Sequence, residues 1–128
     1  MIEQLKIFDN NVIAIEVIDG FTMTDEKYAQ KLFFEKLNQG FEQVNILVKL
    51  DEMKVSKTEI KVFFEDFLFL LRNYKKMGHL AIVAHSNILK ILIPIDNLFF
   101  ERASKGRLER YFDVSQMKDA MEFVNPNN

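Results

Sequence analysis

Cysteine is absent from this sequence of 128 residues, and glycine and proline are scarce, with four and two residues. Without cysteine there is no disulfide framework, no thiolate zinc site and no cysteine nucleophile. Each glycine is explained by a turn or by a helix end, so none remains for a GxGxxG or GxxxxGKS/T phosphate-binding loop. The sequence therefore excludes nucleotide binding of those two types.

Histidine is also scarce, and its two positions argue against a shared metal ion. His79 and His85 lie at the two ends of one predicted strand. At about 3.3 Å per residue they are roughly 20 Å apart. We expect no metal site and no cofactor.

Long apolar runs and a strong excess of one charge are missing as well. Glu65, Asp66, Lys90 and Asp96 interrupt the candidate membrane spans, and the first ten residues lack the pattern of a signal peptide. The net charge of −2 gives no general attraction to nucleic acid. We expect a cytoplasmic protein with no nucleic-acid partner and no stable membrane insertion.

Phenylalanine, by contrast, is abundant. The chain has thirteen, and several fall in the run VFFEDFLFLL at Val62–Leu71. So much aromatic surface must be buried in a core, in a ligand cavity or in a subunit contact.

The apolar periodicity predicts strands that alternate with helices. Residues 1–124 form one domain and 125–128 a frayed tail. The expected strands are 2–8, 12–18, 43–50, 79–85 and 107–112, and the expected helices run from Thr24 to about Asn38, over about 57–75, over about 87–104 and from Asp113 to about Val124. The order ββαβαβαβα predicts an α/β fold with a mixed, mostly parallel five-stranded sheet and about four helices, the first two strands being antiparallel because their turn is short.

Capping residues mark the predicted helix starts. Thr24 and Ser86 are candidate N-caps, and Ser56 with Glu59 forms a capping box for the Phe-rich helix. Asp113 with Gln116 is a second capping box. Pro94 predicts a kink or break in the helix over 87–104.

Four segments carry a resemblance to a known family: AIEVIDGFTMTDEKY (14–28), LVKLDEM (47–53), HLAIVAH (79–85) and RLERYFDVSQMKDAMEFV (107–124). In order and spacing they resemble the SpoIIAA-like family of STAS-type domains, which are related in shape to the lipid-binding lobe of Sec14/CRAL-TRIO proteins. The resemblance implies an α/β domain, often dimeric, without established chemistry in most members.

One position departs from STAS regulators of sigma factors, which carry a phosphorylatable serine beside an aspartate after the third strand. This chain has Asp51-Glu52-Met53 there, and the nearby Ser56 is explained as a helix cap. The resemblance thus implies a regulatory domain without the usual phosphorylation site.

Exposed apolar residues give the first hypothesis, a partner-contact surface. Val62 and Phe69 lie seven residues apart on one line of the Phe-rich helix, away from its core face. Phe34 falls on the outer side of the first helix. These three residues predict a seam for homodimerisation or for another protein.

A small apolar, lipid-like ligand is the alternative. The Phe-rich helix and the segment 87–104 would enclose it, although a bent core helix is the favoured explanation of that segment. The candidate pocket residues are Phe63, Phe67, Ile88, Leu92, Ile95 and Phe99.

A polar site at the carboxyl edge of the sheet is the third hypothesis. His85 with Asp51 or Glu52 would be the acid/base pair, because α/β folds bind ligands at this edge. No serine or cysteine nucleophile motif accompanies them. The sequence therefore predicts a non-catalytic interaction domain.

Overall fold

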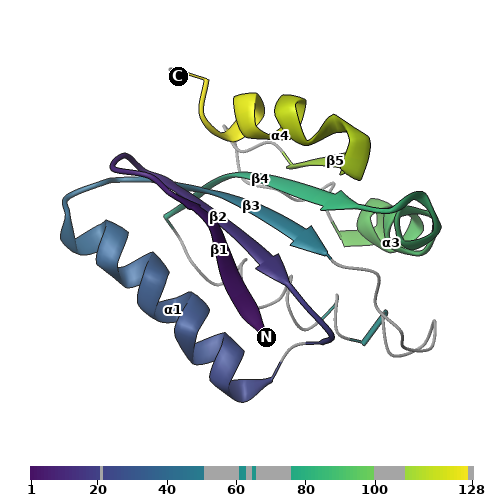
Figure 1. The fold of residues 1–128 in the computed structure, drawn as a ribbon, viewed down its shortest axis with the longest axis horizontal. Helices are drawn as coiled ribbons and strands as arrows, with labels where there is room; N and C mark the ends of the chain where they lie inside the picture. The colour runs from purple at the N-terminus through teal and green to yellow at the C-terminus, as the bar shows by residue number, and fades with distance from the viewer. Residues whose placement is uncertain (21, 51–60, 63–64, 66–75, 100–108, 127–128) are drawn as a thin grey trace.

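The computed structural model describes the whole chain except residues 21, 51–60, 63–64, 66–75, 100–108 and 127–128 (Figure 1). Its elements follow one another as strands, helices and one short 3-10 helix. They are β1 (Ile2–Ile7), β2 (Val12–Val17), α1 (Met23–Asn38), β3 (Val44–Leu50), β4 (Met77–Ala84), α3 (Ser86–Phe99), β5 (Glu109–Asp113), the 3-10 helix η2 (Val114–Gln116) and α4 (Met117–Val124).

The five strands form one mixed sheet, as the sequence predicted. Their spatial order is β1-β2-β3-β4-β5; β1 and β2 are antiparallel, and the other neighbours are parallel. The three-residue turn after Phe8 is too short for a crossover, which fixes the antiparallel pair. β1 carries a bulge between Gln4 and Lys6.

The described residues contain three α-helices, whereas about four were predicted. The helix predicted over about 57–75 lies outside the described residues apart from Lys61, Val62 and Glu65, which are helical. α3 continues through Pro94 to Phe99, so no break occurs there. No helix in the described part of the chain is long and apolar enough to cross a membrane.

Both sides of the sheet are covered, which explains why its inner strands are almost wholly apolar. α1 and α3 lie on one side, here called the α1 face, and α4 lies on the other, the α4 face (Figure 1). Ile15, Val48 and Ile82 belong to the larger core on the α1 face, with Leu32 and Phe33 of α1.

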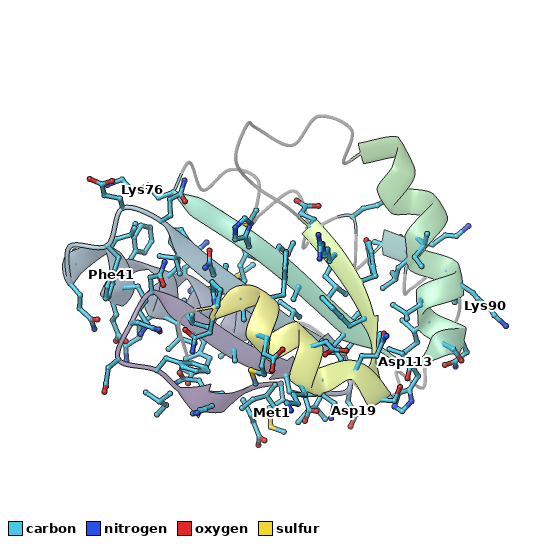
Figure 2. The ribbon with its side chains drawn as sticks, turned by 90° about the horizontal axis from the view of Figure 1, so that it is seen from above. Met1, Asp19, Phe41, Lys76, Lys90 and Asp113 are labelled. Carbon is cyan, nitrogen blue, oxygen red and sulfur yellow. The ribbon has the colours of Figure 1, made fainter. Side chains whose placement is uncertain are left out.

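The smaller core on the α4 face is built around small strand residues. Ala14, Leu47 and Ala81 pack there with Ala120 and Val124 of α4. Figure 2 looks onto this face and shows α4 lying across the sheet. Small residues on both sides bring α4 close to the strands.

The N-cap of α1 is Thr22, not the predicted Thr24. Asp25 N–H donates to the Thr22 hydroxyl at 3.2 Å, and the Thr22 N–H donates to Asp25 Oδ2 at 2.8 Å. This capping box needs an acceptor side chain three residues after the cap, and Asp25 stands there. Asp25 also accepts the Ile2 N–H at 3.1 Å, so one carboxylate joins α1 to β1.

The predicted capping box of Asp113 and Gln116 is present. It opens the 3-10 helix η2, and α4 begins one turn later at Met117. Asp113 ends β5 and thereby fixes the entry of the chain into α4 (Figure 2).

Asn45 links β3, β4 and α4. Its Oδ1 accepts the His79 N–H at 2.8 Å, and its Nδ2 donates to the Val124 carbonyl at 2.9 Å. The register of β3 and β4 shifts between Val44 and Ile46, which places Gly78 against this side chain. A glycine inside a strand marks such a close approach.

Candidate functional site

The predicted partner-contact residues are partly described. Phe34 and Val62 are large apolar side chains with exposed fractions of 50% and 53%. Phe34 contacts Phe33 edge-on, with ring centroids 6.3 Å apart, so it extends outward from the α1 core contact. Phe69 lies outside the described residues. The contact itself stays a prediction.

Part of the predicted ligand pocket belongs to the core of the described structure. Ile88 and Leu92 of α3 are buried in the core of the α1 face, among Leu80, Ile82 and Ala84. Lys90 extends outward from the same helix (Figure 2). The other four candidates lie outside what the structure describes, either as residues (Phe63, Phe67) or as side chains (Ile95, Phe99).

The polar site at the carboxyl edge is only partly described, because Asp51 and Glu52 lie outside the described residues. His85 follows β4, and its carbonyl accepts the N–H groups of Ile88 and Leu89, each at 3.0 Å. The His85 carbonyl therefore accepts the first hydrogen bonds of α3, so a structural role explains why the chain has a residue at this place.

Asp113 ends β5 near His85, since Ala84 pairs with Asp113 in the sheet. The Asp113 carboxylate accepts the Ser115 hydroxyl at 2.6 Å and the Ser115 N–H at 2.9 Å. These bonds, and more weakly the nearby His85, hold the pKa of Asp113 below its usual value. A carboxylate with a lowered pKa is a weak general base near neutral pH.

A metal site is not formed by the described side chains, because no three His, Asp or Glu residues among them lie close enough together to hold an ion.

A groove on the α4 face was not predicted from the sequence. It encloses about 270 Å³ between the end of β1 and α4. Its lining consists of Lys6, Phe8, Lys118, Met121, Glu122 and Asn125, here called the Lys6–Lys118 groove. Its residues come from two segments more than a hundred positions apart, so no local motif could have indicated it.

Hydrogen bonds fix the side of the groove formed by the turn after β1. Lys36 of α1 donates through Nζ to the carbonyls of Phe8 and Asn10, at 2.5 and 2.6 Å. Burial lowers the pKa of Lys36, while Asp9 and Glu35 oppose that shift. The backbone at Phe8 is thus held by a side chain of α1.

The α4 side of the groove is tied to the same turn. Asn10 Nδ2 donates to Asn125 Oδ1 at 2.8 Å, and Asn45 holds the preceding Val124 carbonyl. Asn125 is only 6% exposed. Both walls therefore have defined positions before any ligand binds.

Two ammonium groups stand at the groove. Lys6 Nζ lies 5.0 Å from the centroid of the Phe8 ring, within the range of a cation–π contact. Lys118 projects from α4, where Glu122 follows one turn later. The groove thus combines apolar side chains, two cations and one anion.

The comparisons with known proteins give one family. A search of curated proteins and a search of solved structures found no match. The family model described as SpoIIAA-like matches residues 12–125, which include every described element from β2 to α4. Together with the five-stranded mixed sheet and its helices on both faces, this match establishes that the chain belongs to the SpoIIAA-like family of STAS-type domains.

Proposed function

We propose that this domain is a non-catalytic regulatory or interaction domain that forms a homodimer. The family match supports a role in regulation or interaction, because STAS-type domains generally act through protein contacts. The observation that carries the proposal is the exposure of Phe34 and Val62, each about half accessible. Large apolar side chains of this kind are enriched where proteins associate.

Among the described residues, the titratable side chains at the carboxyl edge of the sheet give little support to an acid/base enzyme. Asp113 is engaged by Ser115 and has a lowered pKa, and the backbone of His85 is used to start α3. Neither arrangement resembles a nucleophile held by a general base. A cytoplasmic location is part of the proposal, as the sequence suggests.

The dimer surface is proposed to include the outer side of α1 and the helical residues 61–62. Phe34 supplies the aromatic anchor, and aromatic residues near the centre of an interface carry much of its binding energy. The exposed Lys31 and Glu35, which form an i,i+4 pair at 3.9 Å, would lie at its polar rim.

Native mass spectrometry and light scattering over a concentration series test this proposal. The wild type should be a dimer, and Phe34→Gln should raise the dimer dissociation constant at least about tenfold, as expected for a hot-spot aromatic. Lys31→Gln is the matched control on the same helix and should leave the constant within about threefold.

Val62→Gln should act in the same direction as Phe34→Gln. A wild type that stays monomeric up to about 1 mM, the weak end of the affinity scale, would refute self-association. Dimers of both variants with unchanged affinity would instead refute the proposed surface around Phe34 and Val62. Unchanged circular dichroism spectra would confirm that the variants are folded.

A further inference from the structure

The Lys6–Lys118 groove combines several features of a ligand site. Small-molecule sites are concave, mostly apolar, and carry a few convergent polar groups. Here Phe8 and Met121 supply apolar surface, and Lys6, Lys118 and Asn125 supply hydrogen-bond donors. The site lies on the α4 face, opposite the proposed dimer surface, so it does not depend on the proposed function.

The charges in the groove favour an anion with a single negative charge. Two ammonium groups and one carboxylate line it, which leaves one net positive charge. Lys118 and Glu122 are spaced i,i+4, yet among the described residues no ion pair within 4.0 Å engages either of them or Lys6. Both ammonium groups can therefore turn toward a bound anion.

Asn125 adds a donor that is fixed in place. Its Oδ1 already accepts the Asn10 amide, so its own N–H groups are what it can offer a ligand. A head group that meets two ammonium groups and an amide donor must accept hydrogen bonds. An ionised carboxylate accepts only, and it carries the single charge that the groove balances.

The size of the groove limits the rest of the ligand. Its volume of about 270 Å³ lies just below the range of about 300 to 1,000 Å³ typical of pockets for drug-sized ligands, which suits a smaller ligand of about ten heavy atoms. The Phe8 ring and the Met121 thioether favour an apolar body, because sulfur and aromatic faces pack well against alkyl and aryl groups. A medium-chain fatty acid or a small aryl carboxylate has these properties.

We propose that the Lys6–Lys118 groove binds a small amphipathic monocarboxylate, with the carboxylate between Lys6, Lys118 and Asn125 and the apolar body against Phe8 and Met121. The groove would thus sense or carry a metabolite on the face of the sheet that α4 covers.

Titration of the ¹⁵N-labelled protein with octanoate tests the proposal. The amide signals of Phe8, Met121 and Asn125 should shift with one common dissociation constant, and those around Phe34 should not. Octylamine, with the same body and the opposite charge, should not bind measurably. Octanol should bind at least about threefold more weakly, because it lacks the charge-assisted bonds.

Variants separate this site from adventitious binding to lysines. Lys6→Gln and Lys118→Gln should each raise the octanoate dissociation constant about three- to tenfold, the range between exposed and well-formed charge-assisted bonds. Lys27→Gln, an exposed lysine on α1, is the control and should change nothing.

Three results would overturn the proposal: octanol binding as tightly as octanoate, shifts centred outside the groove, or equal affinities in all three lysine variants. Octyl phosphate binding more tightly than octanoate would overturn the carboxylate assignment. The oligomeric state of each variant is measured in parallel. A failed titration with an intact dimer would therefore refute the groove and leave the proposed dimer standing.

Discussion

Gly78→Ala should destabilise the fold through Asn45 and not through the backbone. A Cβ on Gly78 would lie well within 3.0 Å of Asn45 Oδ1, and a separation that short forces one of the two atoms to move. The other two nearby atoms, at 3.4 Å, are in ordinary contact. Gly78 is not among the glycines with positive φ, so alanine fits its backbone.

The magnitude follows from what Asn45 holds. Its displacement weakens the bonds to the His79 N–H and the Val124 carbonyl. Each is worth about 1 kcal/mol net, so Gly78→Ala should lower the free energy of unfolding by about 2 kcal/mol. Asn45→Ala should cost about 2 to 3 kcal/mol, because it leaves both partners unsatisfied.

A double-mutant cycle isolates the coupling. In the Asn45→Ala background the clash is gone, and Gly78→Ala should be neutral or stabilising by about 0.5 kcal/mol, because alanine loses less entropy on folding than glycine. The coupling energy should therefore be about 2 kcal/mol in urea unfolding followed by circular dichroism, with unchanged m-values. Costs that add within about 0.5 kcal/mol would refute this reasoning.

Two further predictions concern α1. Burial tends to raise the pKa of Asp25, but hydrogen bonds from Thr22 and the Met1 ammonium outweigh it and hold the pKa below 3.8. The stability that Asp25 contributes is thus present above pH 3.8 and is lost as the pH falls through and below that value. Asp25→Asn should lower the free energy of unfolding by about 1 to 2 kcal/mol at neutral pH. It should also make that free energy fall less steeply with acid, which urea unfolding from about pH 6 to pH 3 would measure. A fall as steep as that of the wild type would contradict this prediction. Lys36→Met should lower the free energy of unfolding by about 1 to 2 kcal/mol, because the carbonyls that Lys36 holds lose their donor. The exposed control Lys31→Met should change it by no more than about 0.5 kcal/mol. Equal effects of the two substitutions would show that the Lys36 hydrogen bonds contribute nothing to stability.

The sequence determined the sheet. Runs such as VIAIEVI are apolar at nearly every position, which is typical of strands covered on both faces. The alternation with helices and the short turn after Phe8 then fixed a mixed, mostly parallel sheet. The capping box of Asp113 and Gln116 was also readable, because its two partners are local in the chain.

Local sequence patterns did not settle the start of α1 or the effect of Pro94 on α3. Thr22 and Thr24 both precede acidic residues, and only the capping box with Asp25 selects Thr22. Pro94 predicted a kink or a break, and α3 continues without a break to Phe99. Packing of Ile88 and Leu92 into the core supports the helix on one side of the proline, and tertiary contacts can offset one lost hydrogen bond.

The tertiary structure alone decided what distant residues form together. The parallel register of β2 and β3 sets Glu16 beside Lys49 at 2.7 Å, and the bulge in β4 presses Gly78 against Asn45. The Lys6–Lys118 groove exists because residues of α4 and Asn125 come close to Lys6 and Phe8 at the end of β1. Periodicity fixes which face a residue takes within its own element, but the approach of two elements depends on how their side chains fill the space between them.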